Sequence, residues 1–153
     1  MDEKELVRAL TDLPGVATVT AGPDNGAPEA AWGDSFFFYD PDDGIPADRR
    51  MPFATVVVKD YPGFDTASDL DRPGVFRLNL AVGRARFTEL FGFGPAEFAA
   101  HRDSFDFTVL DKVMPHPVYA TQGWACILVP NQIPDLVAHA HQRAKDRYRP
   151  HHG

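Results

Sequence analysis

The sequence predicts an α+β domain, in which a mostly antiparallel sheet carries an N-terminal helix, two short central helices and a C-terminal helix. Helical and strand-like patterns follow one another in blocks, so a repeated βαβ sheet is not expected. Hydrophobic residues make up 44% of the 153 residues, which is enough for a packed core. A chain of this length fits one domain, predicted over residues 1–149, with a frayed tail at 150–153.

The N-terminal helix is predicted over residues 2–12, because Leu6, Val7 and Leu10 share one helical face. A short strand and a turn are expected within 16–34. Two further strands are predicted from short runs of aromatic or β-branched residues bounded by turn residues. They span 35–40 and 53–59, and an acidic loop at 40–52, too polar to bury, joins them.

A second long loop, at 60–74, leads into the run "VFRLNLAV", which alternates between apolar and polar residues. The alternation predicts a half-buried strand with Phe76, Leu78 and Leu80 directed inward. The segments "GRARFTELFG" and "GPAEFAAHR" predict the two short helices, and "WACILV" predicts a strong strand. The last helix is expected to begin near Pro134.

The composition argues against several classes of function. A net charge of −7 repels phosphate backbones, so neither nucleic acid nor an anionic membrane is expected as a partner. The N-terminus is charged and lacks the apolar region of a signal peptide, and no apolar run approaches a membrane span, so a cytoplasmic location is predicted. The single cysteine, Cys126, lies in an apolar run and is expected to be a small buried core residue.

His116 is the first candidate for a functional residue. It lies between Pro115 and Pro117, whose fixed φ angles hold the imidazole on a rigid, extended backbone. Such a rigid histidine is useful as a general base or as a ligand-binding group, and Asp106 or Asp111 is a candidate to orient the ring. The same pattern is also typical of a structural corner before a strand.

Aromatic and cationic residues supply the other candidates. Tyr119 and Trp124 each present an apolar body with one polar tip, which suits either a cavity wall or the core. Arg77 becomes an anchor for a carboxylate or phosphate if its face of the strand opens to a cavity. The residues predicted to line an aromatic cleft are Trp32, Phe38, Arg77, His116, Tyr119 and Trp124.

No recognised catalytic, metal or cofactor motif is present in the sequence. Asp40, Asp42 and Asp43 have a spacing that can hold Mg²⁺ or Ca²⁺, but no glutamate closes an EF-hand loop, so a solvated acidic loop is favoured. His139 and His141 are two positions apart on a helix, so they cannot chelate one ion together. Metal-ligand pairs, a glycine-rich phosphate loop and a nucleophile elbow are all missing. We therefore predict no metal and no cofactor, and do not favour an enzyme.

Four segments carry a resemblance to a known family: "GDSFFFYDPDD", "PFATVVVKD", "LDRPGVFRLNL" and "MPHPVYATQGWACILVP". Between about Asp34 and Val137 they resemble an uncharacterised bacterial family, domain of unknown function 6194. The chain is also distantly similar to the MmcQ/YjbR-like proteins, with Pro117, Tyr119 and Trp124 in their late proline–tyrosine–tryptophan pattern.

The resemblance implies a fold but no activity. A role in DNA binding has been proposed for some MmcQ/YjbR-like proteins, whose pattern places a lysine close to the tryptophan. Here Thr121 and Gln122 occupy that region and the lysine is missing. Together with the acidic charge, this departure leads us to expect the fold without the DNA function.

The sequence leaves three functions open. The favoured one is a cytosolic domain that binds a small molecule or peptide in an aromatic cleft. The second is an enzyme that uses His116 as a general base and Arg77 as an anion anchor. The third is a protein–protein interaction or regulatory module that presents a sheet face or the final helix, and the oligomeric state stays open.

Overall fold

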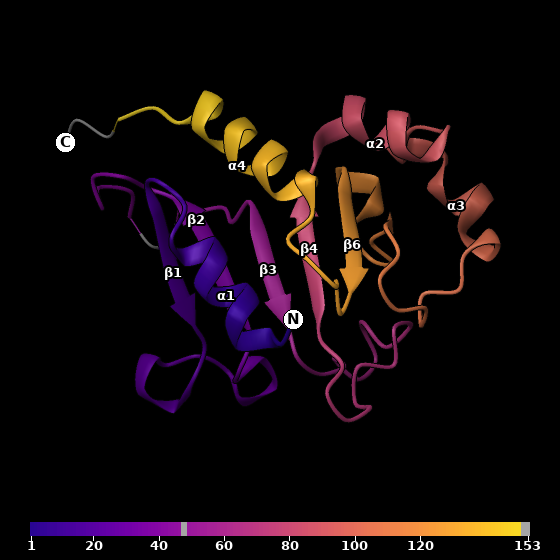
Figure 1. Cartoon of the computed structure of the whole chain (residues 1–153), viewed down its shortest axis with the longest axis horizontal. Helices are drawn as coiled ribbons and strands as arrows, with labels where there is room; N and C mark the ends of the chain where they lie inside the picture. The colour runs from indigo at the N-terminus through magenta and orange to yellow at the C-terminus, as the bar shows by residue number, and fades with distance from the viewer. Residues whose placement is uncertain (47–48, 151–153) are drawn as a thin grey trace.

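Six strands in the described part of the chain, residues 1–46 and 49–150 of a computed structural model, form one sheet. The strands are β1 (Val16–Thr20), β2 (Ser35–Tyr39), β3 (Ala54–Val57), β4 (Arg77–Ala81), β5 (Met114–Pro115) and β6 (Trp124–Leu128). They lie in the order β1-β2-β3-β4-β6-β5, and every neighbouring pair is antiparallel (Figure 1). The predicted α+β class with an antiparallel sheet is confirmed. Of the predicted tail at 150–153, residues 151–153 lie outside the described part.

The four helices of the described residues also follow the prediction. They are α1 (Glu3–Thr11), α2 (Gly83–Phe91), α3 (Phe98–His101) and α4 (Asp135–Arg147). Asp2 begins α1, because its carboxylate accepts the backbone N–H of Glu5 at 2.8 Å. Gly92 ends α2 in a left-handed conformation with φ of 79°, which glycine adopts without strain.

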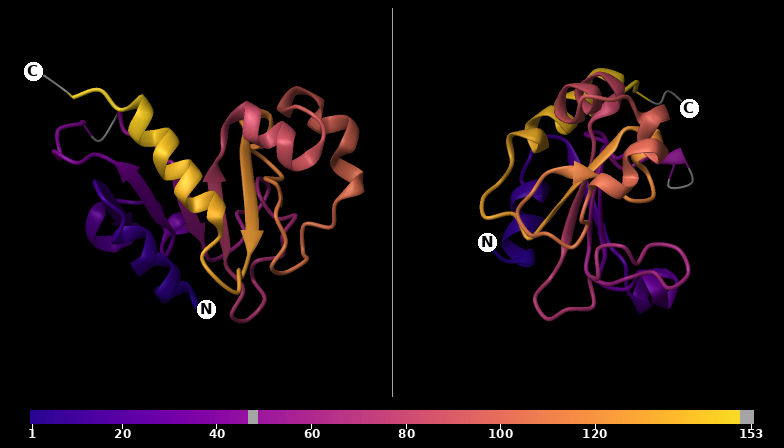
Figure 2. Two further views of the ribbon diagram at one scale, coloured as in Figure 1. Left: turned by 45° about the horizontal axis from the view of Figure 1, so that its top comes forward. Right: turned by 90° about the vertical axis from the view of Figure 1, so that its right-hand side faces the viewer.

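The helices leave one face of the sheet without a helical cover. Helices α1 and α4 pack on the same face, whereas the loop that follows β1 and the first part of the loop that follows β3 lie on the other side (Figure 2). Helix α2 packs at the end of the sheet against β5 and β6. The face without α1 and α4 is called the open face below. None of the helices in the described residues combines the length and apolar character that a membrane crossing requires.

Strand pairing places one side chain of every strand in a row across the open face. Paired residues of antiparallel neighbours lie on the same side of a sheet, so the register determines the members of this row. The row consists of Val19, Phe36, Thr55, Asn79, Cys126 and Met114. Val57, Arg77 and Leu128 form a second row beside it.

Two expectations about burial were wrong. The run through β4 is buried on both faces, since Arg77 and Asn79 are only 0% and 3% exposed on the side opposite Leu78 and Leu80. The acidic loop at 40–52 was expected to be too polar to bury, but Asp40 is buried. Its carboxylate accepts the backbone N–H of Gly44 at 3.0 Å and binds Arg50 at 3.0 Å, which replaces the lost hydration.

Half of the 12 phenylalanines pack together around α2 and α3 and not in a cleft. Ring centroids in this group lie 4.8–6.3 Å apart, mostly edge to face or tilted. The members of this cluster are Phe87, Phe91, Phe93, Phe98, Phe105 and Phe107. These phenylalanines therefore pack with one another. Their number alone does not support an aromatic cleft.

Candidate functional site

Arg77 is the residue around which the open face is organised. It lies on β4, a strand with a neighbour on each side, and its side chain is the largest fully buried one in the described residues. The alternation of a strand turns Arg77 and Asn79 to the open face and Leu78 and Leu80 to the helices. A buried guanidinium needs a partner for each of its N–H groups, because it has lost its hydration.

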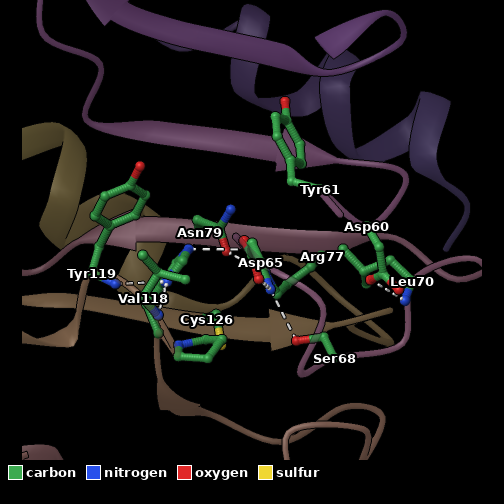
Figure 3. A network of polar contacts seen from close by, with 12 residues as sticks. Asp60, Tyr61, Asp65, Ser68, Leu70, Arg77, Asn79, Val118, Tyr119 and Cys126 are labelled. Carbon is green, nitrogen blue, oxygen red and sulfur yellow. Dashed lines mark hydrogen bonds and ion pairs between the residues drawn. The ribbon is translucent and has the colours of Figure 1, made fainter. Parts of the chain in front are cut away.

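The chain itself supplies these partners (Figure 3). Nη1 and Nη2 donate to the two oxygens of Asp65 at 3.1 and 2.6 Å. Nη1 also donates to Oγ of Ser68 at 2.9 Å, and Nε donates to Oδ1 of Asn79 at 2.8 Å. Nη2 lies 3.2 Å from Nε2 of His116. All five N–H groups of Arg77 are therefore directed at atoms of the chain.

The second long loop delivers Asp65 to the sheet. Tyr61 and Asp65 exchange two backbone hydrogen bonds, at 2.9 and 2.8 Å, which close a tight turn. The carboxylate of Asp60 accepts the backbone N–H of Leu70 at 2.9 Å and holds the base of the loop. Burial alone would raise the pKa of Asp65, but the hydrogen bonds and charge of Arg77 outweigh it and hold that pKa below its usual value.

A second buried carboxyl, Asp34, fastens the start of the same loop. Asp34 accepts a short hydrogen bond from the hydroxyl of Tyr61, and another from the backbone N–H of Val58 at 2.9 Å. Burial raises the pKa of Asp34 even though both hydrogen bonds oppose the shift. Burial also raises the pKa of Tyr61, and its hydrogen bond to Asp34 adds to this. Tyr61 is therefore a neutral donor at physiological pH.

His116 is an uncharged ring surrounded by donors. Its Nδ1 accepts the backbone N–H groups of Val118 and Tyr119, each at 3.0 Å, while Nε2 faces Arg77. A neutral imidazole has one nitrogen with a free lone pair, so three N–H groups already compete for it. Burial, followed by the positive charge of Arg77, lowers the pKa of His116 to about 3.

The expected acidic partners of His116 lie elsewhere. Asp111 binds Asn131 through its backbone and side-chain nitrogens, at 3.0 and 2.6 Å, and Asp106 binds Thr108. The ring is oriented instead by the loop backbone that follows it and by Arg77. The sequence could not identify these contacts because they depend on the path of the chain.

A cavity of about 650 Å³ lies over these polar side chains. Asp65, Arg77, Asn79 and His116, which line it, are called the polar floor below. Four of the six predicted cleft residues line it: Arg77, His116, Tyr119 and Trp124. Residues that the sequence did not single out complete it, among them Phe36, Thr55, Val57, Tyr61, Phe64, Asp65 and Asn79. At the mouth, the ring of Phe64, which is 57% exposed, lies 6.0 Å from the ring of Tyr119.

Trp32 and Phe38 are not among the residues that line the cavity. Trp32 is 37% exposed, and its indole N–H donates to the carbonyl of Ala27 at 3.0 Å. Phe38 is on the same face of β2 as Phe36, but it lies near the end of the strand, where the guanidinium of Arg50 covers its ring at 5.5 Å. Strand alternation puts Phe36 and Phe38 on one face of β2, and Phe36 is the member of that face that lines the cavity.

His139, His141 and Cys126, the residues considered for metal or thiol chemistry, are not among those that line this cavity. These residues hold no group of three or more histidines, cysteines or acids that could ligate a metal ion. His139 and His141 contact different carbonyl groups, those of Val82 at 3.1 Å and Pro14 at 2.7 Å. Cys126 is buried, as predicted, and burial raises the pKa of its thiol to about 12, which keeps it protonated.

A second hollow, of about 720 Å³, lies beside the start of α1. Its walls include Lys4, Asp71 and Val75, and its charged residues are at least partly exposed. Among the described residues that line it, no buried polar side chain is found, which distinguishes it from the cavity over Arg77. The cavity on the open face is therefore the candidate functional site.

The fold and this site define a class of α+β protein with a buried Arg–Asp pair under an apolar cavity. The protein belongs to the family of unknown function DUF6194, which matches the whole chain, residues 1–153. The resemblance to this family is confirmed, whereas the similarity to MmcQ/YjbR-like proteins and the bacterial origin stay predictions. No curated protein and no solved structure matches the chain.

Replacing Arg77 by methionine should strongly destabilise the fold, because Asp65 would be left buried without its partner. We expect a loss of about 3–5 kcal/mol in the free energy of unfolding, measured by urea denaturation. Arg84 is exposed on α2, and its replacement by methionine should change this free energy by no more than about 0.5 kcal/mol. Similar small losses for both variants would show that the buried pair contributes little.

Replacing His116 by asparagine should make stability less sensitive to acid. The pKa of His116 falls from 6.5 to about 3 on folding, so the unfolded chain binds a proton that the folded chain rejects. The contribution of the neutral His116 to the free energy of unfolding is complete above 6.5, the pKa of this residue in the unfolded chain. It is lost as the pH falls from 6.5 toward 3. Between about pH 6 and pH 4, unfolding free energies should fall by up to about 1.4 kcal/mol per pH unit more in the wild type than in the variant. Parallel curves would contradict the neutral ring.

Proposed function

We propose that this protein binds a small organic molecule in the cavity on the open face of the sheet. One observation carries the proposal: buried polar groups converge on the floor of a cavity whose walls are mostly apolar and aromatic. Its volume of about 650 Å³ is typical of small-molecule sites, which range over roughly 300–1,000 Å³. Such a combination of apolar walls and a few fixed polar groups suits a ligand that needs both burial and orientation.

The rigidity of the floor supports binding further. Arg77 is fixed by Asp65, Ser68 and Asn79, and Asn79 in turn donates to Oγ1 of Thr55 at 2.9 Å. These side chains have already lost their rotamer freedom on folding. A ligand that packs against them therefore does not have to order them, which favours affinity.

The same contacts argue against the enzymatic alternative. Arg77 and His116 do approach each other, with 3.2 Å between Nη2 and Nε2, as a base and an anion holder would require. A general base needs an accessible lone pair, however, and His116 is 1% exposed with N–H groups of the chain at both ring nitrogens. We therefore favour binding over catalysis.

Filling the cavity should abolish ligand binding. Val57 lines the cavity, whereas its neighbour Val58 lines the hollow beside α1, so the pair Val57→Phe and Val58→Phe adds the same bulk on opposite faces. A chemically diverse metabolite library should contain compounds that raise the Tm of the wild type and of Val58→Phe but not of Val57→Phe. At about 100 times Kd, a ligand should raise Tm by about 5–10 °C.

Two results of this thermal-shift experiment would overturn the proposal. One is a library in which no compound moves the Tm of the wild type. The other is a set of hits that stabilise Val57→Phe as strongly as Val58→Phe, because such compounds would bind outside the cavity.

A further inference from the structure

We infer that the cavity takes an uncharged, largely apolar molecule and rejects anions and cations. The inference rests on the proposed function and deepens it by naming the chemical class of the ligand. It follows from how the charges and hydrogen-bonding groups of the cavity are already used within the chain.

The charges at the cavity cancel each other. Among the described residues that line it, only Asp65 and Arg77 are acidic or basic, and their side chains meet at 2.6 Å. His116 adds no charge, because a proton on its ring would put one more donor among those that already surround it. A charged ligand would thus lose its hydration without meeting an unpaired opposite charge.

Neither Arg77 nor Asp65 is free to leave its partner and bind a charged ligand instead. An anion that bound Arg77 would have to displace Asp65 from two hydrogen bonds, and Asp65 would then stay buried without a cation. A cation at Asp65 would meet oxygens that both accept from Arg77. Because breaking a buried pair is strongly unfavourable, either ligand would bind weakly.

The polar groups left for a ligand are neutral and lie on the walls. Tyr119, Gln122 and Trp124 line the cavity, and the hydroxyl, amide and indole N–H of these side chains make no hydrogen bond to another described residue. The apolar surface comes from residues such as Phe36 and Val57. This distribution fits a molecule with an apolar body and a neutral polar group.

Two fluorescent probes with the same ring skeleton test the inference. N-phenyl-1-naphthylamine is uncharged, and 8-anilinonaphthalene-1-sulfonate adds one sulfonate to it. We expect the uncharged probe to bind the wild type and Val58→Phe with increased fluorescence, and to lose binding in Val57→Phe. The sulfonate probe should bind the cavity at least about tenfold more weakly. Ala31→Phe, at another residue that lines the cavity, serves as a second blocking variant should Val57→Phe not fold.

The outcomes separate this inference from the proposed function. Equal or tighter binding of the sulfonate probe, sensitive to the blocking variants, would overturn the inference and leave a small-molecule site in place. Binding of the uncharged probe that the blocking variants do not reduce, or no binding of either probe, would also overturn it. The proposed function itself is tested by the thermal-shift experiment with the metabolite library.

Discussion

The pair between Arg77 and Asp65 is the interaction on which the open face depends. Arg77 belongs to an inner strand of the sheet, where a charged side chain is costly unless its partners are arranged around it. Asp65 comes from a loop that has no strand or helix of its own, so the pair also determines where that loop lies. Three residues of this loop, Tyr61, Phe64 and Asp65, line the cavity, so the pair also holds part of the cavity wall in place.

The polar floor is self-contained, and this property shapes what the site can do. Arg77 uses its donors on Asp65, Ser68 and Asn79, and His116 stays neutral among N–H groups. A group that serves as an anion anchor or as a base would need free capacity, which these side chains lack. The network contributes shape and rigidity, so recognition depends on the apolar side chains and the neutral polar groups of the walls.

Much of the architecture was predictable because it follows from local patterns. Periodic apolar residues identified three of the four helices, the proline at position 95 indicated the other, and the alternation in β4 put Arg77 and Asn79 on one face. The rigid segment around His116 was likewise visible from its two prolines. Burial was harder to predict: Asp40 and the polar face of β4 looked exposed, since their partners were unknown. Trp32 and Phe38 were plausible cleft residues because of their aromatic side chains. The cavity is lined instead by Phe36, which lies on the same face of β2 as Phe38.

The sequence by itself determined most of the secondary structure, the antiparallel class and which side chains of a strand share a face, because all of these depend on neighbouring residues. The tertiary structure alone decided that Arg77 meets Asp65, 12 positions before it, and His116, 39 positions after it. Such pairings depend on the path of loops, and loops carry no periodic pattern from which a path can be predicted. For the same reason, only the folded chain could show that a cavity covers this face of the sheet.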